Sequence, residues 1–371
     1  MIKILFLIHD LGQGGAEKVL VNLVNNMDQN KFDITVMTLF DVGVNRQFLK
    51  KSIKYKACFK KVFKGNSHIM KLWSPERLHR HFVKDEYDIE VAYLEGPCAR
   101  IISGCPNPKT KLVSWIHVEQ HTKAKACASF RNYEEAKKCY TQFHRIACVS
   151  EAVRQDFQNI FELQTPVDVL YNTNETAQIL ERSQDAVEEG IFKEGCFHIV
   201  GVGKLLKNKG FDRLLRIGKQ LIDEGFPIHV LILGIGPEKS SLERYIETNR
   251  LQERVRLLGY QTNPYNYVSN SDLFVCASFA EGFSTATTEA LIVGTPVCTV
   301  KVAGMKEMLG ENNEYGVVVE NDEESLYLGI KHFLENPQEI IKYKRLARER
   351  GKCFSTENTV KAVEDMLLNL F

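Results

Sequence analysis

Short apolar runs alternate with helix-like segments along almost the entire chain, and this alternation constrains the fold more strongly than any other feature. The runs are apolar throughout, which is typical of parallel strands covered on both faces. Segments with helical periodicity lie between them, such as 15–27, 210–224 and 284–293, and Gly225 and Gly294 follow the last two as stop signals. The pattern predicts an α/β protein with two doubly wound parallel sheets. The strand-like runs are IKILFLIH, FDITVMTLF, DIEVAYL, KLVSWIHV, HRIACVS and VDVLYN in the first half, and FHIVGVG, IHVLILG, RVRLLG, DLFVCAS, TPVCTV and YGVVVE in the second.

The length of the chain favours two domains, because 371 residues are too many for one ordinary core. A polar stretch over 174–194 carries no strand signal and marks the break between them. We therefore expect a first domain over 1–180 and a second over 181–352. Residues 353–371 are predicted to form a helix that packs back on the first domain.

Composition and charge exclude several classes of protein. Apolar content of 44% is ordinary for a globular chain, and no run of about 18 uncharged apolar residues could span a membrane. The opening apolar run meets Asp10 without a cleavage site, so we expect a strand rather than a signal peptide. The ten cysteines show no zinc-ligand spacing, which favours reduced thiols in the cytoplasm and no bound metal. A net charge of +1 without a basic-aromatic platform argues against nucleic-acid binding.

The positive charge is concentrated near the start of the chain. Residues 1–180 carry 25 Lys and Arg against 19 Asp and Glu, and the segment 43–75 holds nine of these cations and no acid. Within 46–71, lysines and apolar residues recur at three- and four-residue intervals, a pattern that favours a helix lying on an anionic membrane. A solvated basic surface whose aromatic residues belong to the core is the alternative. The residues concerned are Lys50, Lys51, Lys54, Lys60, Lys61 and Lys64 among Phe48, Leu49, Ile53, Tyr55, Phe59, Val62 and Phe63.

The loops that follow the strands carry the candidate site, because ligands of open α/β sheets bind beyond the carboxyl ends of the strands. After the first strand, Gly14 and Gly15 open directly into a helix whose free N–H groups could hold an anion. The spacing is not that of a dinucleotide-binding fingerprint, because Glu17 stands at the third glycine position. A tight turn without a ligand is the alternative.

Two further loops of this kind occur in the second half. Gly203 precedes Lys204 and Lys209, two cations that flank a loop entering a helix and could clamp a diphosphate. The arrangement does not match the phosphate-binding Walker pattern, and a solvated lysine loop is the alternative. Gly234 begins a loop that leads through a proline into a helix, where it could contact a base.

The most specific pattern is a pair of acids after the run DLFVCAS. Glu281 is expected in the loop at the carboxyl end of that strand, and Glu289 on the following helix about two turns deeper. Both carboxylates could then accept hydrogen bonds from one ligand, with a phosphate at the helix N-terminus between them. The alternative is that both acids are simply solvated. The apolar neighbours Leu291 and Ile292 argue against this for Glu289.

The order GGAE, VGKLLKNKGFDRLL, LILGIGP and EGFSTATTEAL with GTPV resembles the retaining GT-B glycosyltransferases with the Glu-x7-Glu motif. This large family includes sucrose synthase and many bacterial capsular and exopolysaccharide enzymes, and the resemblance covers nearly the whole chain. It implies two facing Rossmann-like domains, the first binding the acceptor and the second the nucleotide sugar. It implies no cofactor and no metal, since the nucleotide sugar, expected to be a UDP-sugar, is a substrate.

The resemblance also implies roles for single residues. Glu281 would contact hydroxyls of the donor sugar, Lys204 and Lys209 the diphosphate, and Glu289 the ribose. His117 matches a histidine that the family uses near the transferred sugar, although a histidine of the core is the alternative. The residues expected to bind the donor are Gly14, Gly15, Gly203, Gly234, Phe283, Ser284, Thr285 and Glu289.

Two positions depart from the family pattern. Lys204 stands where the family usually has arginine, so a bidentate phosphate contact would be lost. Ser284 stands where glycine is common, and its hydroxyl could reach the phosphate.

The expected function is therefore transfer of a sugar from a nucleotide-diphosphate donor to a glycan or lipid-linked saccharide, with retention, in bacterial surface polysaccharide synthesis. The expected location is the cytoplasm, with peripheral attachment to the inner face of the cell membrane left open. The alternatives are a sugar-nucleotide epimerase and a non-catalytic adaptor of the same fold; a pyridoxal-dependent phosphorylase would need a much longer chain. The sugar and the oligomeric state do not follow from the sequence.

Overall fold

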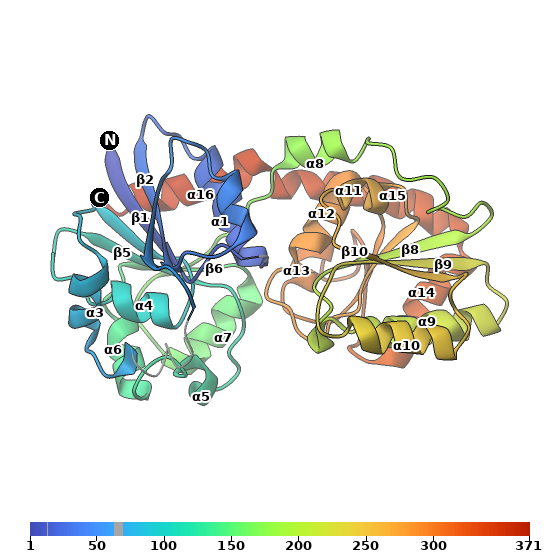
Figure 1. The fold of residues 1–371 in the computed structure, drawn as a ribbon, viewed down its shortest axis with the longest axis horizontal. Coiled ribbons are helices and arrows are strands. Elements are labelled where there is room, and N and C mark those ends of the chain that lie inside the picture. Colours follow the sequence, from blue (N-terminus) through green and yellow to red (C-terminus); the bar gives the residue numbers. More distant parts are fainter. Residues whose placement is uncertain (13, 63–69) are drawn as a thin grey trace. The chain divides into compact units, whose positions relative to one another are not determined.

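The computed structural model describes residues 1–12, 14–62 and 70–371. The chain divides into two compact units (Figure 1). Unit 1 comprises Met1–Asn174 and Thr356–Phe371, and unit 2 comprises Glu175–Ser355. Within the described residues, no helix is both long enough and apolar enough to cross a membrane.

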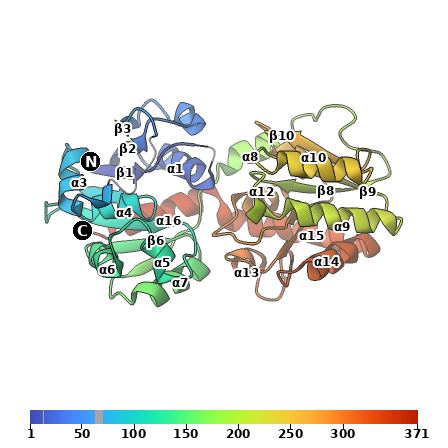
Figure 2. The same cartoon turned by 60° about the horizontal axis from the view of Figure 1, so that its bottom comes forward.

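Unit 1 has a parallel sheet with helices on both of its faces (Figure 1 and Figure 2). Its strands are β1 (Ile2–Ile8), β2 (Phe32–Phe40), β3 (Lys54–Phe59), β4 (Ile89–Ala92), β5 (Lys111–Ile116), β6 (Arg145–Cys148) and β7 (Val167–Val169). Its helices are α1 (Gly15–Asn26), α3 (Pro75–Phe82), α4 (Pro97–Ile102), α5 (Lys123–Ala126), α6 (Tyr133–Tyr140), α7 (Glu151–Phe161) and α16 (Thr356–Leu368), with the 3-10 helix η1 (Val44–Phe48). The C-terminal helix α16 packs against α1.

Unit 2 repeats this architecture. Its strands are β8 (Phe197–Val202), β9 (Ile228–Leu233), β10 (Val255–Gly259), β11 (Leu273–Cys276), β12 (Val297–Val300) and β13 (Val317–Val319). Its helices are α8 (Thr176–Arg182), α9 (Phe211–Asp223), α10 (Lys239–Thr248), α11 (Tyr265–Ser269), α12 (Thr285–Val293), α13 (Met305–Leu309), α14 (Glu323–Glu335) and α15 (Pro337–Gly351), with the 3-10 helices η2 (Lys207–Lys209) and η3 (Lys352–Phe354). Helix α9 packs against α10 and α14, and helix α12 packs against α11 and α15.

The order of the strands places a switch point in each sheet. The order is β3-β2-β1-β4-β5-β6-β7 in unit 1 and β10-β9-β8-β11-β12-β13 in unit 2. Ile4 of β1 lies opposite Ile34 of β2 and Ile89 of β4, and Ile199 of β8 lies opposite residues of β9 and β11. Because the winding reverses at these strands, the loops after β1 and β4, and after β8 and β11, flank the crevice where such sheets bind ligands.

The predicted α/β class is confirmed, and its physical basis is visible in the strands. All six residues of β9 are buried, as are the last five of β1, which is why these runs show no polar alternation. Helix α12 ends at Gly294, whose φ of +84° is a left-handed conformation that glycine adopts without strain.

Over 46–62, the part of the segment 46–71 that the structure describes before residue 63, the chain does not form the amphipathic helix that its periodicity suggested. It contains the end of η1 and the strand β3, which pairs with β2 at the edge of the sheet. The hydroxyl of Tyr55 donates to Asp41 at 2.9 Å, and the ring of Phe59 stacks on Phe40 with 5.7 Å between ring centres. These aromatic side chains pack against the sheet, whereas the lysines of this edge strand are exposed. Phe63 and Lys64 lie outside the described residues.

Candidate functional site

The candidate site of unit 2 lies where the loops after β8 and β11 meet. The loop after β8 contains η2 and ends at Gly210, whose φ of +65° precedes α9. A Cβ atom at Gly210 would lie 2.0 Å from the carbonyl oxygen of Ala277, directly after β11, so only glycine fits there. The backbone N–H of Phe279 also donates to the carbonyl of Asn208 at 2.7 Å. The two loops are therefore joined through their backbones.

Lys209 and Glu281 come into contact between these loops. Nζ of Lys209 donates to Oε1 of Glu281 at 2.6 Å, and the hydroxyl of Ser278 donates to the same oxygen at 2.6 Å. The Glu281 side chain is 10% exposed and that of Lys209 26% exposed. A charge-assisted hydrogen bond that is only partly open to water is stronger than one on the surface. The fold thus brings together two of the residues that the sequence singled out, from opposite sides of the switch point.

A buried arginine that the sequence analysis did not identify holds the loop after β11. Arg213 on α9 is 1% exposed and donates to the carbonyls of Ala277 at 2.7 Å and Ser278 at 3.0 Å. Its remaining terminal nitrogen donates to Oδ1 of Asn321 at 2.9 Å, and the guanidinium lies 4.3 Å from the ring centre of Phe279. The available signal was a charged residue on the apolar face of an amphipathic helix, a position that demands buried partners.

The start of α12 supplies its own cap. The hydroxyl oxygen of Ser284 accepts hydrogen bonds from the N–H of Thr287 at 3.3 Å and from its hydroxyl at 3.0 Å. Thr285 is the first residue of the helix, and Phe283 packs edge-on against Phe354 with 5.8 Å between ring centres. Ser284 therefore has a structural reason for its position, which is separate from the phosphate contact expected of it.

Glu289 and Lys204 differ sharply in their surroundings. Glu289 on α12 is 7% exposed, so it is not the solvated acid of the alternative interpretation. Lys204 is exposed, and within the described part of the chain it forms no ion pair. The structure therefore does not join Lys204 to the pair formed by Lys209 and Glu281.

Gly203 and Gly234 allow the loops after β8 and β9 to approach closely. Gly234 has a φ of +146°, and a Cβ atom on it would lie 1.9 Å from the carbonyl oxygen of Gly203. A Cβ atom at Gly236 would meet the carbonyl of Leu205 at 2.4 Å. Backbone packing accounts for the glycines at 234 and 236, whether or not a donor contacts this loop.

In unit 1, an acid of the chain itself covers the glycines after β1. The N–H of Gly12 donates to Oδ1 of Asp10 at 2.7 Å, Gly14 caps α1, and Gly15 is its first residue. The carboxylate of Glu17 folds over Gly14, where an added Cβ atom would lie 1.8 Å from its oxygen. Glu17 thus places a negative charge at the helix N-terminus that was expected to hold an anion, and a phosphate there would have to displace it.

His117 directly follows β5 and is 8% exposed. Burial lowers the pKa of His117 to about 4, so its imidazole is neutral near pH 7. Its Nε2 atom is buried without a hydrogen-bond partner among the described residues, and its ring centre lies 5.0 Å from that of Tyr93. Because an unpaired buried polar atom is unfavourable, a ligand group that bonds to Nε2 would stabilise this arrangement.

The sequence analysis did not identify Glu95, which accompanies His117. The N–H of His117 donates to Oε2 of Glu95 at 3.1 Å, and burial raises the pKa of that carboxyl group. Glu95 lies just beyond β4, next to β1 in the sheet. Its place at the switch point was the only available signal, and the strand order was needed to see it.

Both halves of the chain match known family models. Residues 13–178 match the family Glycosyltransferase Family 4, and residues 184–351 match the family Glycosyl transferases group 1. Between them the two matches take in most of the chain: the first covers β2 to β7 and the second covers β8 to β13.

Relatives align over nearly the full chain. The N-acetylgalactosamine-N,N'-diacetylbacillosaminyl-diphospho-undecaprenol 4-alpha-N-acetylgalactosaminyltransferase of Campylobacter jejuni is 28% identical, with 99% of each chain covered. The lipopolysaccharide core biosynthesis glycosyltransferase LpsD of Rhizobium meliloti is 22% identical over 98% of this chain and 96% of its own. The crystal structure of HepE from Anabaena, in complex with UDP and glucose, has a TM-score of 0.77 at 18% identity and 99% coverage of both chains. With two doubly wound sheets, a family match on each and full-length relatives of the same kind, this chain belongs to the group 1 glycosyltransferases with the GT-B fold.

Proposed function

We propose that this chain transfers a sugar from a nucleotide-diphosphate donor, which we expect to be a UDP-sugar, to a glycan or a lipid-linked saccharide. The transfer would retain the anomeric configuration. The observation that carries the proposal is the 2.6 Å contact between Lys209 and Glu281 at the carboxyl edge of the unit 2 sheet. Binding of a diphosphate requires a cation, and binding of sugar hydroxyls requires a hydrogen-bond acceptor. Lys209 and Glu281 supply these two groups at the switch point.

The relatives support the classes of donor and acceptor. The Campylobacter jejuni relative is named for transfer to a saccharide on diphospho-undecaprenol, and HepE was solved with UDP and glucose. We infer that a lipid-linked saccharide in the bacterial cytoplasm is the acceptor to test first, within surface polysaccharide synthesis.

Binding of the donor would break the contact between Lys209 and Glu281 and give each of them a new partner. Lys209 and Glu281 satisfy each other in this structure, which avoids an unpaired charge in a partly buried place. The diphosphate would draw Lys209 toward itself, and the hydroxyls of the donor sugar would take its place on Glu281. Ser278 stays within reach of the carboxylate throughout, since its hydroxyl already donates to Oε1.

The transfer breaks the bond between the anomeric carbon and the diphosphate oxygen. The acceptor hydroxyl forms the new bond on the same face of the sugar, and its proton passes to the leaving diphosphate. Lys209 and Lys204 neutralise the charge that develops on that group. Glu289 is proposed to bind the ribose, and His117 to bond to the transferred sugar through Nε2. No step of this scheme uses a metal or another cofactor.

A screen of nucleotide sugars tests this function. A donor present at 100 times its dissociation constant should raise the free energy of unfolding by roughly 2.7 kcal/mol, and the stabilising donor should then be consumed only with an acceptor. NMR of the product reports whether the configuration is retained. Conversion of the free nucleotide sugar without an acceptor would instead identify an epimerase, and failure to bind any nucleotide sugar would favour the adaptor.

We also propose that unit 1 binds anionic membranes through the exposed part of the basic segment. Lys51, Lys60 and Lys61 are exposed and form no ion pair within the described residues, and Phe48 and Val62 are 58% and 54% exposed. Each such lysine could contribute about 1 kcal/mol at an anionic surface. The contact would thus come from the ends of η1 and β3 rather than from one helix.

Three other lysines of the segment already have partners. Nζ of Lys50 donates to the carbonyl of Asn25 at 2.7 Å, Lys54 pairs with Asp33 at 2.6 Å, and Lys56 pairs with Asp85. These three cations contribute to the surface of the unit, and the proposal does not depend on them.

A further inference from the structure

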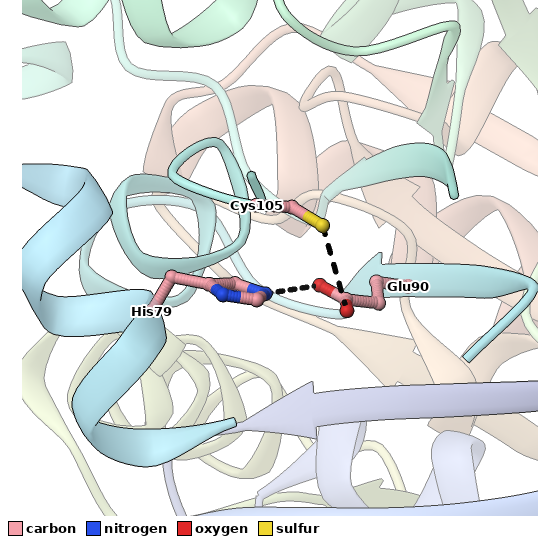
Figure 3. Close-up of side chains that lie close together, drawn as sticks. All are labelled: His79, Glu90 and Cys105. Carbon is pink, nitrogen blue, oxygen red and sulfur yellow. Dashed lines mark hydrogen bonds and ion pairs between the residues drawn. The ribbon is translucent and has the colours of Figure 1, made fainter. Parts of the chain in front are cut away.

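Three side chains that are good metal ligands converge inside unit 1, away from the loops described above. His79 comes from α3, Glu90 from β4, and Cys105 from the segment that follows α4 (Figure 3). One ligand atom from each residue lies within 4.8 Å of the other two. His79 is 5% exposed and Glu90 2%, whereas Cys105 is half-buried. The cluster is therefore closed on the side of the sheet and reachable from the side of the cysteine.

The carboxylate of Glu90 contacts both of its neighbours. Its Oε2 atom lies 2.7 Å from Nε2 of His79, and Sγ of Cys105 donates to Oε1 at 3.7 Å. Nδ1 of His79 is buried without a hydrogen-bond partner among the described residues. Burial opposes the charge, but hydrogen bonds to Cys105 and Glu90 and the charges of these two residues raise the pKa of His79 to about 9, so a metal ion at this cluster would displace a proton from the imidazole.

We propose that His79, Glu90 and Cys105 bind one Zn²⁺ ion. Imidazole nitrogen, carboxylate oxygen and thiolate sulfur are the ligands of Zn²⁺ in proteins, at about 2.0–2.3 Å. Tetrahedral ligands at that range lie about 3.2–3.8 Å from one another, and in the cluster one ligand atom from each residue lies within 4.8 Å of the other two. Small side-chain movements suffice to admit the ion.

The charges of the cluster balance when the ion binds. Bonds to the metal replace the two contacts of Glu90, and one imidazole proton of His79 and the thiol proton of Cys105 pass to solvent. The thiolate and the carboxylate then offset the charge of Zn²⁺, with His79 neutral. A water from the half-buried side of Cys105 takes the fourth position.

The ion would join elements that are distant in the sequence. It links α3 to β4 and to the segment after α4, while Glu90 precedes the carboxyl end of its strand. The site lies within unit 1, and it goes beyond sugar transfer without depending on it.

Cobalt binding by the full-length protein tests the proposal. The protein is stripped of metal with a chelator and titrated with Co²⁺, whose thiolate complexes absorb in the near ultraviolet. We expect one equivalent to produce this band in the wild type and in Cys127→Ser, a control at another half-buried cysteine of unit 1. Cys105→Ser should lose the band. Zn²⁺ should displace Co²⁺ and raise the unfolding temperature of the first two proteins but not of the third.

Two results would overturn the zinc site. One is a wild type that shows no band at saturating Co²⁺, and the other is a band that Cys105→Ser leaves unchanged. Either would leave a metal-free contact between His79 and Glu90. The absence of a band in the wild type would overturn the site without any variant, and circular dichroism checks that Cys105→Ser is folded before its lost band is counted as support. Sugar transfer is not part of the readout.

Discussion

Nζ of Lys209 lies 2.6 Å from Oε1 of Glu281, although 72 positions separate the two residues in the chain. The contact exists because β8 and β11 are neighbours in the sheet, so that their following loops meet at one edge. In the function proposed above, each of the two residues would exchange the other for part of a nucleotide sugar. The first two predictions address the two members of this pair.

Replacing Glu281 with glutamine should reduce turnover by about 100-fold or more, the scale for removing one electrostatically matched group from a reacting centre. The amide keeps the shape of the side chain but cannot match the negative charge beside Lys209. Steady-state kinetics measures the loss, with circular dichroism as the check on folding. Glu253→Gln is the matched control, because Glu253 pairs with Lys193 at 2.7 Å on an exposed surface. Normal turnover in Glu281→Gln would contradict the proposed role.

Lys209→Ala and Lys204→Ala should each weaken UDP binding by about 10- to 100-fold, as expected for a charge-assisted hydrogen bond. Uridine, which lacks the diphosphate, should bind to both variants as it does to the wild type. Isothermal titration calorimetry gives both affinities. Lys207→Ala is the control, since Lys207 is an exposed lysine of the same loop. Equal loss of UDP and uridine would mean that the lysines support the loop and do not bind phosphate.

Most of the fold could be predicted because buried parallel strands carry an unusually clear signal. Twelve apolar runs correspond to twelve strands, including β9, whose residues are all buried. The strand β3 was missed because KYKACF lies at the edge of the sheet, with Lys54 and Lys56 in solvent. Its spacing therefore resembled an amphipathic helix more than a buried strand.

Candidate residues in motifs that follow strands could be selected from the sequence, whereas candidates defined by tertiary contacts could not. Lys209 and Glu281 belong to loops that follow strands, and the rule for open α/β sheets is enough to select them. Arg213 acts through carbonyls that belong to another loop, and Glu95 acts through the N–H of His117. Neither partner can be inferred from spacing, because the distance along the chain says nothing about which loop a helix will face.

Arg213→Met should lower the unfolding temperature and turnover together. Methionine fills similar space but leaves the carbonyls of Ala277 and Ser278 without donors, at a cost of about 1–3 kcal/mol for each. Loss of this support should also loosen the loop that carries Glu281. Thermal unfolding and kcat are the measurements. Arg216→Met is the control, since Arg216 lies on the same helix in exposed ion pairs and should have an effect below about 1 kcal/mol. A stable Arg213→Met protein with normal kcat would contradict this role.

Stability of unit 2 should fall in mild acid because of His229. It is fully buried on β9, and both of its ring nitrogens lack hydrogen-bond partners among the described residues. Burial, assisted by the charges of His198, Lys193, Arg256 and Arg254, lowers the pKa of His229 to about 4. Histidine in the unfolded chain titrates near 6.5, so between these values the unfolded chain binds more protons. The free energy of unfolding should therefore decrease as the pH falls from about 6.5 to 4, by up to about 3 kcal/mol.

Urea unfolding at pH 7 and pH 5 measures this dependence. His229→Leu should reduce it without loss of stability at pH 7, because the leucine leaves no hydrogen bond unmade. His332→Leu, at an exposed position of α14, should keep the dependence of the wild type. An unchanged acid sensitivity in His229→Leu would assign the effect to another group, of which His117 is the first to examine, since burial lowers its pKa to about 4 as well.

Membrane binding should depend on Lys51, Lys60 and Lys61 and should weaken with salt. The wild type is expected to float with liposomes that contain anionic lipid at low ionic strength, and to be released as salt screens the lysines. Replacing all three with glutamate should abolish flotation and lower transfer to a lipid-linked acceptor, while transfer to a soluble analogue and donor binding stay unchanged. Lys50 is left in place, because its ammonium group bonds to the carbonyl of Asn25 at the end of α1.

The control makes the same charge change elsewhere on unit 1, at three exposed lysines that lie outside the basic segment. Glutamate at Lys109, Lys138 and Lys361 alters the net charge equally, so it separates a local surface from a general attraction of the protein to anionic lipid. This variant should float almost as well as the wild type. If both triple variants lose flotation to the same degree, the attraction is not specific to the basic segment. If the wild type itself fails to float at low salt, unit 1 has no membrane surface, and a soluble glycan becomes the acceptor to pursue.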